Sequence, residues 1–249
     1  SEGMKALQRR VLHRLLNPLP MHPAATGFVP QRSIVVNARP HAGQGVVINI
    51  DLADFFPSIS AERVHQALCG LGWNKESSRI LTHICTHEGR LPQGAPTSPA
   101  LSNLVCRRLD TRLAKLAAAH QGQYTRYADD ITVSFPTLRS GRRSQKAAGP
   151  KVAHRRLLGL IRAIIEDERF KIQMKKKVRV QRAHQRQTAT GLVVNERANL
   201  PREFRRRIRA AEHHERLGKL GHKEKAILRG WQALLDMVAK QRAVPATSS

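Results

Sequence analysis

Two adjacent aspartates lie in the middle of a stretch that favours β-structure. Asp129 and Asp130 interrupt the run 123–135, which is rich in β-branched and aromatic residues of the kind found in strands. The pattern predicts a β-hairpin whose tight turn carries both carboxylates, and paired carboxylates can bind a divalent cation. Most Asp-Asp turns are solvated turns whose side chains hydrogen-bond to their own backbone, so this pair alone does not establish a metal site.

A third carboxylate follows a largely apolar run far upstream in the chain. The run 46–50 ends on Asp51 and predicts a buried strand, because it is short and rich in β-branched residues. Acids at the ends of neighbouring strands can converge on one point. The sequence therefore predicts one site that contains Asp51, Asp129 and Asp130.

The elements that must position these acids form a mixed set of helices and strands. Apolar residues at helical spacing and capping residues predict most of the helices. We expect helices over 4–16, from Ser58 or Ser60 to about 71, from Asn74 to about 84, from the N-cap Ser98 to about 120, over 157–165 and from Pro201 onwards, and short strands over 170–180 and 188–195. Residues 27–41 are expected to form a connector and 137–154 a flexible basic loop. Residues 1–3 precede Met4 and are left out of this scheme.

The loop 91–99 contains recurring Pro and Gly residues that exclude regular structure. It leads directly into the helix predicted from Ser98. The free N–H groups at the start of a helix suit an anion, so we expect this loop and helix to face a triphosphate or a nucleic-acid backbone.

The charge of the chain predicts a polyanionic partner. Lys and Arg number 44 against 18 Asp and Glu, which gives a formal net charge of +26. Such an excess favours binding to phosphates. Aromatic residues make up only 4% of the chain, which argues against a broad base-stacking platform.

Other features indicate a soluble, cytoplasmic protein without a membrane partner. No apolar run approaches the ~20 residues of a membrane span, and basic residues interrupt the N-terminal apolar pattern, unlike a signal peptide. The three cysteines, Cys69, Cys85 and Cys106, are too far apart for a CxxC pair and are expected to be reduced core residues. His83 and His87 could hold a metal at helical spacing, but without a third ligand a structural role is favoured.

Three segments resemble the polymerase motifs of reverse transcriptases, in the same order. They are Asp51-Leu52-Ala53-Asp54-Phe55-Phe56, Leu91-Pro92-Gln93-Gly94-Ala95-Pro96-Thr97-Ser98-Pro99 and Tyr127-Ala128-Asp129-Asp130. Within that superfamily the chain most resembles bacterial retron reverse transcriptases, over about residues 5–235. Asn37-Ala38-Arg39-Pro40-His41 is similar to their NAxxH hallmark, and 188–195 is similar to the second, usually VTG, with Ala189 in place of Val.

The resemblance implies an α+β right-hand polymerase palm with an antiparallel sheet, partial fingers and a helical thumb. It implies partial fingers and a connector over 4–45, a palm over 46–197 with a fingers insertion at about 58–96, and a thumb over 198–249. Family members normally begin with additional residues that build the outer fingers and contact the incoming nucleotide. The chain starts beyond them, so its unaided activity is an open question.

The resemblance also assigns roles to residues. Asp51 and Asp129 would bridge two Mg²⁺ ions, with Mn²⁺ as a possible substitute, and Asp130 and the Leu52 carbonyl would support them. Asp54 is assigned to positioning on the nucleotide side or to a structural turn. Nucleotide contacts are expected from Phe56, which would exclude a 2′-hydroxyl, and from Gln93, Gly94 and Lys176. Template and primer contacts are expected from Tyr127, Gly191, Arg205, Arg206 and Arg209.

The function implied is that of an RNA-directed DNA polymerase. Its partners would be dNTPs, a structured RNA template, the RNA–DNA duplex and a defence effector protein, and its product a short DNA that serves phage defence. Two alternatives stay open: another bacterial reverse transcriptase, derived from an intron or a different defence system, and a catalytically silent, basic RNA-binding subunit.

Overall fold

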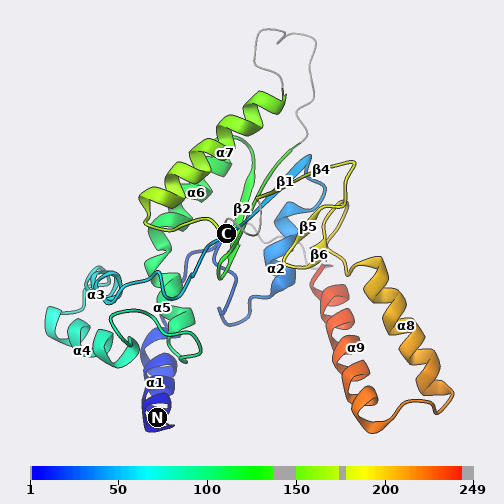
Figure 1. Cartoon of the computed structure of the whole chain (residues 1–249), viewed down its shortest axis with the longest axis horizontal. Coiled ribbons are helices and arrows are strands. Elements are labelled where there is room, and N and C mark those ends of the chain that lie inside the picture. The colour runs from blue at the N-terminus through cyan, green and yellow to red at the C-terminus, as the bar shows by residue number, and fades with distance from the viewer. Residues whose placement is uncertain (1, 137–149, 174–177, 243–249) are drawn as a thin grey trace.

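The computed structural model describes residues 2–136, 150–173 and 178–242. An antiparallel sheet lies at its centre (Figure 1). Its strands are β1 (Val46–Asp51), β2 (Gln123–Tyr127), β3 (Asp130–Phe135) and β4 (Arg179–Arg182), in the spatial order β2-β3-β1-β4. The predicted strand before Asp51 and the predicted hairpin are confirmed, and the register pairs Asp51 with Asp130.

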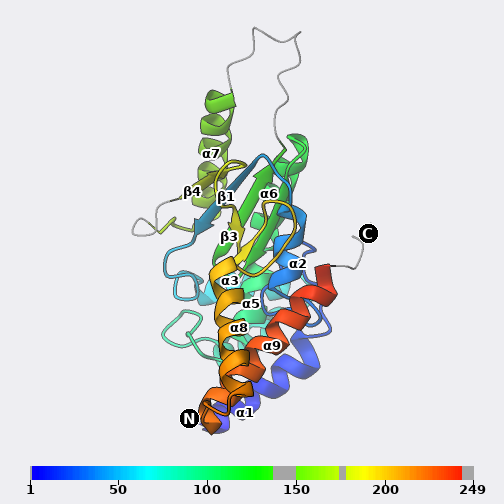
Figure 2. The same cartoon turned by 90° about the vertical axis from the view of Figure 1, so that its right-hand side faces the viewer.

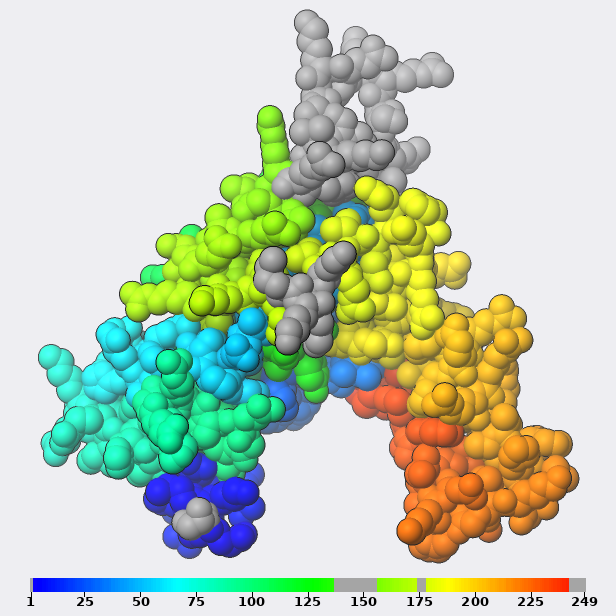
Figure 3. Space-filling view, viewed as in Figure 1, coloured from blue at the N-terminus to red at the C-terminus, as the bar shows by residue number. Residues whose placement is uncertain are grey.

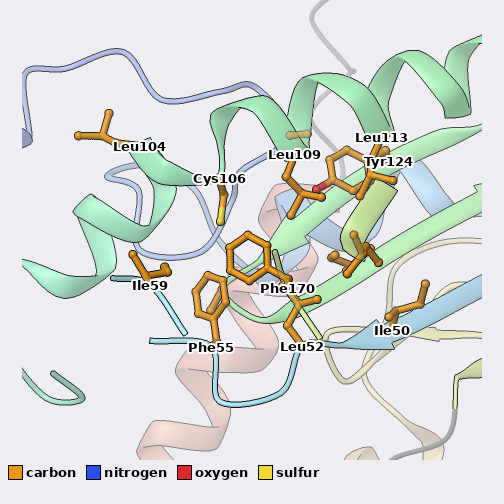
Figure 4. Packing of buried hydrophobic residues seen from close by; sticks show 14 of the residues in the cluster. Ile50, Leu52, Phe55, Ile59, Leu104, Cys106, Leu109, Leu113, Tyr124 and Phe170 are labelled. Atoms are coloured by element: carbon orange, nitrogen blue, oxygen red, sulfur yellow. The ribbon is translucent and has the colours of Figure 1, made fainter. Parts of the chain in front are cut away.

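Helices pack against this sheet and enclose the main apolar core. Helix α6 (Arg107–Ala119) packs on β2 and β3, and α7 (Pro150–Asp167) packs on α6. Figure 4 shows Leu109 and Leu113 of α6 beside Tyr124 of β2. Because one face of the sheet is buried in this way, the ends of its strands are held in fixed positions.

The N-terminal half of the chain contributes a group of helices on one side of the sheet. They are α1 (Glu2–Val11), a π-helix (Leu12–Leu16), α3 (Ala61–Cys69), α4 (Lys75–Cys85) and α5 (Ser98–Val105). Ser60 caps α3 and Asn74 caps α4 through their side chains, as predicted. Glu2 and Gly3, which were left out of the prediction, belong to α1.

The single long helix predicted from Ser98 to about His120 is wrong. The helical chain is interrupted at Cys106, so that α5 and α6 are separate helices. Thr97 occupies the N-cap position, and the hydroxyl of Ser98 donates to the carbonyl of Pro92, 2.7 Å away, instead of capping the helix. This hydrogen bond ties the preceding loop to the start of α5.

Three other expected elements differ from the structure. The connector 27–41 contains a short helix, α2 (Ile34–Ala38), followed by a turn of 3₁₀-helix (Arg39–His41). Helix α7 begins at Pro150, inside the predicted basic loop, whose residues 137–149 lie outside the described part. Of the expected strand 170–180, the described residues form a bridge at Ile172 and the start of β4 at Arg179, and residues 174–177 lie outside the described part.

The C-terminal part forms a second apolar cluster. It contains the hairpin β5 (Thr188–Ala189) and β6 (Leu192–Val193) and the helices α8 (Arg202–Arg216) and α9 (His222–Arg242). The two helices lie side by side in Figures 1 and 2, and Phe204 packs on Trp231 with ring centroids 5.5 Å apart. On α9, Ile227 is exposed and its neighbour Leu228 is buried.

The surface is hollowed between the two groups of helices. Figure 3 shows a wide opening with the N-terminal helices on one side and α8 and α9 on the other. In the part of the chain that the structure describes, no helix has the length and apolar character needed to cross a membrane.

Candidate active site

The turn that carries Asp129 is held in an unusual backbone conformation. Ala128 has φ +55°, a value that residues other than glycine rarely adopt. Gly27 packs directly on this turn, and a Cβ atom at Gly27 would lie 2.7 Å from the backbone nitrogen of Ala128. The close approach therefore requires glycine at position 27.

Backbone hydrogen bonds join the turn to the end of β1. The N–H of Leu52 donates to the carbonyl of Asp129 over 3.0 Å, and Asp51 lies opposite Asp130 in the β1–β3 ladder. The three predicted acids thus come from residues separated by almost eighty positions and meet at one end of the sheet. This juxtaposition is the one that the sequence predicted.

A cleft of about 290 Å³ opens at this end of the sheet. Its lining residues are Asp51, Leu52, Asp54, Phe55, Phe56, Pro57, Gln93, Asp129 and Gln173. Five predicted site residues are therefore brought together, namely Asp51, Leu52, Phe56, Gln93 and Asp129. Asp130, Gly94 and Tyr127 do not line the cleft, although Asp130 and Tyr127 flank its hairpin turn.

The cleft suits a divalent cation in its donor chemistry but does not contain a preformed cage. Asp51 and Asp129 offer carboxylate oxygens, which Mg²⁺ prefers. Among the described residues, no three His, Cys, Asp or Glu side chains form a group ready to hold a metal. His83 and His87 likewise belong to no such group among the described residues.

A buried ion pair supports the turn from behind, and the sequence did not reveal it. Arg126 is fully buried in β2, and its Nε and Nη2 each donate to one oxygen of the Asp110 carboxylate over 2.7 Å. Its Nη1 donates to the carbonyl of Ala128 at 3.0 Å. Tyr124 donates its hydroxyl to Asp110 at 2.6 Å. One guanidinium therefore links α6 to the turn that carries Asp129.

Electrostatics keep this pair charged. Burial opposes the charged form of Arg126, but the neighbouring Asp110 carboxylate outweighs it, and the pKa of Arg126 lies well above its usual value. Burial, with Asp110 beside it, raises the pKa of Tyr124 well above the ordinary range. Both side chains therefore stay protonated as hydrogen-bond donors at neutral pH.

Aromatic side chains form the wall of the cleft around Phe56. Its ring is half-buried, 5.3 Å from the centroid of Phe55 and 6.5 Å from that of Phe28. Phe55 stacks in turn on Phe170 at 5.9 Å. The position of Phe56 beside the acids is thus set by a packed cluster.

The loop before α5 contributes Gln93 to the lining of the cleft. Gln93 and Gly94 are exposed at its tip, and Gly94 has φ +86°, a conformation that favours glycine. Gln173, a cleft residue that the sequence did not predict, donates its N–H to the carbonyl of Asp51 at 2.8 Å.

Gly191 and the three predicted arginines of α8 do not line the cleft. Gly191 has φ +80° in the turn between β5 and β6. On α8, Arg206 and Arg209 are exposed, whereas Arg205 is half-buried and its Nε is buried without a hydrogen-bond partner in the described structure. Lys176 falls outside the described residues.

Two of the three cysteines are buried core residues, as predicted. Cys85 and Cys106 lie in the core and Cys69 is half-buried, all as free thiols. Burial raises the pKa of Cys106 to about 12, so its thiol is unreactive at neutral pH.

Comparison with known proteins gives consistent matches. Residues 1–203 match the family described as reverse transcriptase (RNA-dependent DNA polymerase). The chain is 39% identical over 270 aligned residues to the Retron Mx162 reverse transcriptase of Myxococcus xanthus. The alignment covers 96% of this chain and 54% of the relative. It is 38% identical over 236 residues to the Retron Ec86 reverse transcriptase of Escherichia coli, covering 94% of this chain and 69% of the relative.

Two further matches complete the comparison. The Retron Mx65 reverse transcriptase of Myxococcus xanthus is 38% identical, with 96% of this chain and 57% of the relative covered, so the chain spans about half the length of its two Myxococcus relatives. A solved apo telomerase from Candida tropicalis is similar over 80% of this chain and 44% of its own, with 9% identity and a TM-score of 0.47. The α+β fold, with its antiparallel sheet, is that of a polymerase palm. The chain belongs to the reverse transcriptases and, within them, to the retron type.

Proposed function

We propose that the chain is an RNA-directed DNA polymerase that adds dNTPs to a primer on an RNA template. The observation that carries this proposal is the cleft in which Asp51 and Asp129, from two hydrogen-bonded segments, face the same space as Phe56 and Gln93. In nucleotidyl transfer, carboxylates hold the metal ions beside which the primer end and the nucleotide react.

The two acids would hold divalent cations, with Asp130 as a neighbouring carboxylate and the Leu52 carbonyl as a further oxygen. Bound Mg²⁺ would lower the pKa of the primer 3′-hydroxyl and neutralise charge on the leaving pyrophosphate. The chain's own part is to fix the two carboxylates. The Leu52 to Asp129 hydrogen bond and the Arg126 contact to Ala128 hold the turn, so the acids need little rearrangement when substrate binds.

The wall at Phe56 would select the sugar. A ring held by Phe55 and Phe28 has little freedom to move aside, so an added 2′-hydroxyl would clash with it and deoxynucleotides are the expected substrate. Gln93 and Gly94 would contact the nucleotide from the opposite loop. Lys176 is proposed to contact its phosphates.

The opening between the two helical groups would hold the RNA–DNA duplex. The net charge of +26 and the exposed Arg206 and Arg209 on α8 support phosphate contacts there, with Arg205 on the same helix. Tyr127 and the Gly191 turn would face the primer and template. On this basis we assign 4–45 to partial fingers and a connector, 46–197 to a palm with a fingers insertion at about 58–96, and 198–249 to the thumb.

The retron type further supports a structured noncoding RNA as the template and a short DNA as the product, acting in phage defence with an effector protein. A reverse transcriptase of another bacterial system is the alternative, and inspection of the flanking DNA for a retron RNA separates the two. A silent RNA-binding subunit would bind RNA without extending a primer.

Primer extension on an RNA template with Mg²⁺ and dNTPs tests the proposal. Wild type should extend the primer, and Asp129→Asn should lose about a hundredfold or more of the rate, because one carboxylate that would hold a metal ion is removed. Asp236→Asn, an exposed acid on α9, is the matched control and should extend normally. Equal silence of wild type and Asp129→Asn, with RNA binding intact, would support the silent subunit.

A further inference from the structure

Residues 33–41, which comprise the cap of α2, the helix and the following 3₁₀ turn, contact three separate parts of the molecule. They lie outside the cleft, and the proposed chemistry does not use them. Two of their side chains, Asn37 and His41, are polar yet completely buried. Buried polar groups are costly unless they are fully hydrogen-bonded, so their partners define what the segment does.

The first set of partners lies on the catalytic hairpin. One ring nitrogen of His41 is 2.7 Å from the hydroxyl of Ser134 on β3, and the other is 2.8 Å from that of Thr125 on β2. Thr125 also donates to the carbonyl of Asn37 at 3.1 Å. The segment therefore hydrogen-bonds to both strands of the hairpin that carries Asp129.

The second set lies at the turn between β5 and β6. The Nδ2 of Asn37 donates to the hydroxyl of Thr190 at 3.2 Å, and that hydroxyl donates to the carbonyl of Ile34 at 3.2 Å. Thr190 has φ +45° and precedes Gly191. A β-branched residue rarely adopts this conformation, and such strain persists only where the surroundings enforce it. The two-residue turn of the β5–β6 hairpin requires this conformation, and the two hydrogen bonds to α2 tie Thr190 to that helix.

The third set lies on the thumb helix α9. Ser33 donates its hydroxyl to the side-chain carbonyl of Gln241, and Nη1 of Arg39 lies 3.4 Å from the backbone carbonyl of Gln241. Val35 and Ala38 are buried in the apolar cluster that also contains residues of α8 and α9. One side of this short helix therefore faces the hairpin, and the other faces the thumb.

We propose that residues 33–41 are a positioning element, in which Asn37 and Thr190 fix the Gly191 turn and the thumb relative to the Asp129 hairpin. The element touches no reacting atom. Its consequence for function rests on the proposed binding of an RNA–DNA duplex between palm and thumb. A duplex must contact both parts at once, so loosening their link weakens binding without changing the acids.

Thr190→Val tests the element, because valine keeps the β-branch and the shape while it removes the hydroxyl. Loss of the half-buried Thr190 hydroxyl and its two hydrogen bonds should weaken binding of a fluorescein-labelled RNA–DNA duplex, measured without dNTPs, by about two- to tenfold. Thr190→Ser keeps the hydroxyl and should bind like wild type. The matched control is Thr86→Val, a half-buried threonine at the end of α4 whose hydroxyl donates to the carbonyl of Thr82.

Hydrogen exchange of the amides at 188–193 provides a readout that does not depend on nucleic acid. It should speed up in Thr190→Val and remain unchanged in Thr86→Val. Duplex affinity and exchange equal to wild type in Thr190→Val would overturn the proposal, as would equal losses in both valine variants. If wild type binds duplex but never extends a primer, the proposed function fails while this comparison still decides the role of Thr190.

Discussion

Replacement of Arg126 by methionine is the sharpest test of how the active-site turn is supported. The variant Arg126→Met keeps much of the side-chain volume but leaves the Asp110 carboxylate buried without its cation. Arg126 and Asp110 both have fully buried side chains. Breaking one partner of a buried pair costs about 3–5 kcal/mol, so we expect a loss of that size in the free energy of unfolding, measured by urea denaturation.

Two companion variants test whether burial of the ion pair explains the size of this loss in stability. Arg186→Met breaks an ion pair with Glu203 whose side chains are 51% and 72% exposed, and it should cost far less because water screens the pair. The double variant Arg126→Met with Asp110→Leu removes both charges and should recover most of the lost stability. A loss in Arg126→Met no larger than in Arg186→Met would refute the view that the buried pair holds the turn.

Three further predictions follow from particular residues. Phe56→Ala should raise incorporation of ribonucleotides in primer extension, and unchanged discrimination would count against Phe56 as the sugar-selecting residue. Arg206→Gln should reduce the slope of log affinity for an RNA–DNA duplex against log salt by about 1; the same slope as wild type would mean that Arg206 makes no phosphate contact. Burial lowers the pKa of His41 from 6.5 to about 3, so the folded state binds fewer protons than the unfolded state between these pH values. The unfolding free energy should therefore fall as pH drops through that window, by up to about 1.4 kcal/mol per pH unit, and His41→Gln should show a shallower decline; equal slopes would contradict the assignment.

The parts of the fold that the sequence predicted are those with strong local signals. The strand before Asp51 and the hairpin at Asp129 follow from hydrophobic runs and turn chemistry. Ser60 and Asn74 start their helices because their side chains cap the backbone locally. The predicted strand and hairpin also imply that Asp51 and Asp129 meet. Both acids line one cleft, together with Gln93 from the Pro- and Gly-rich loop.

The parts that the sequence missed depend on contacts made across the fold. Helix α2 begins with β-branched residues of low helix propensity, and its contacts to the hairpin and to α9 come from distant segments. Arg126 resembles many other basic residues in this chain until Asp110, on a separate helix, is seen to pair with it. A single charged residue in a strand of otherwise uncharged residues was the available signal for a buried ion pair.

The central claim, that Asp51 and Asp129 carry out nucleotide addition, is tested most directly by single-nucleotide addition to a labelled primer on RNA. The rate should be measured with Mg²⁺ at saturating dNTP, with wild type and Asp51→Asn at equal duplex occupancy. We expect wild type to add the nucleotide and Asp51→Asn to be slower by about a hundredfold or more. Equal rates in the two proteins would contradict the claim.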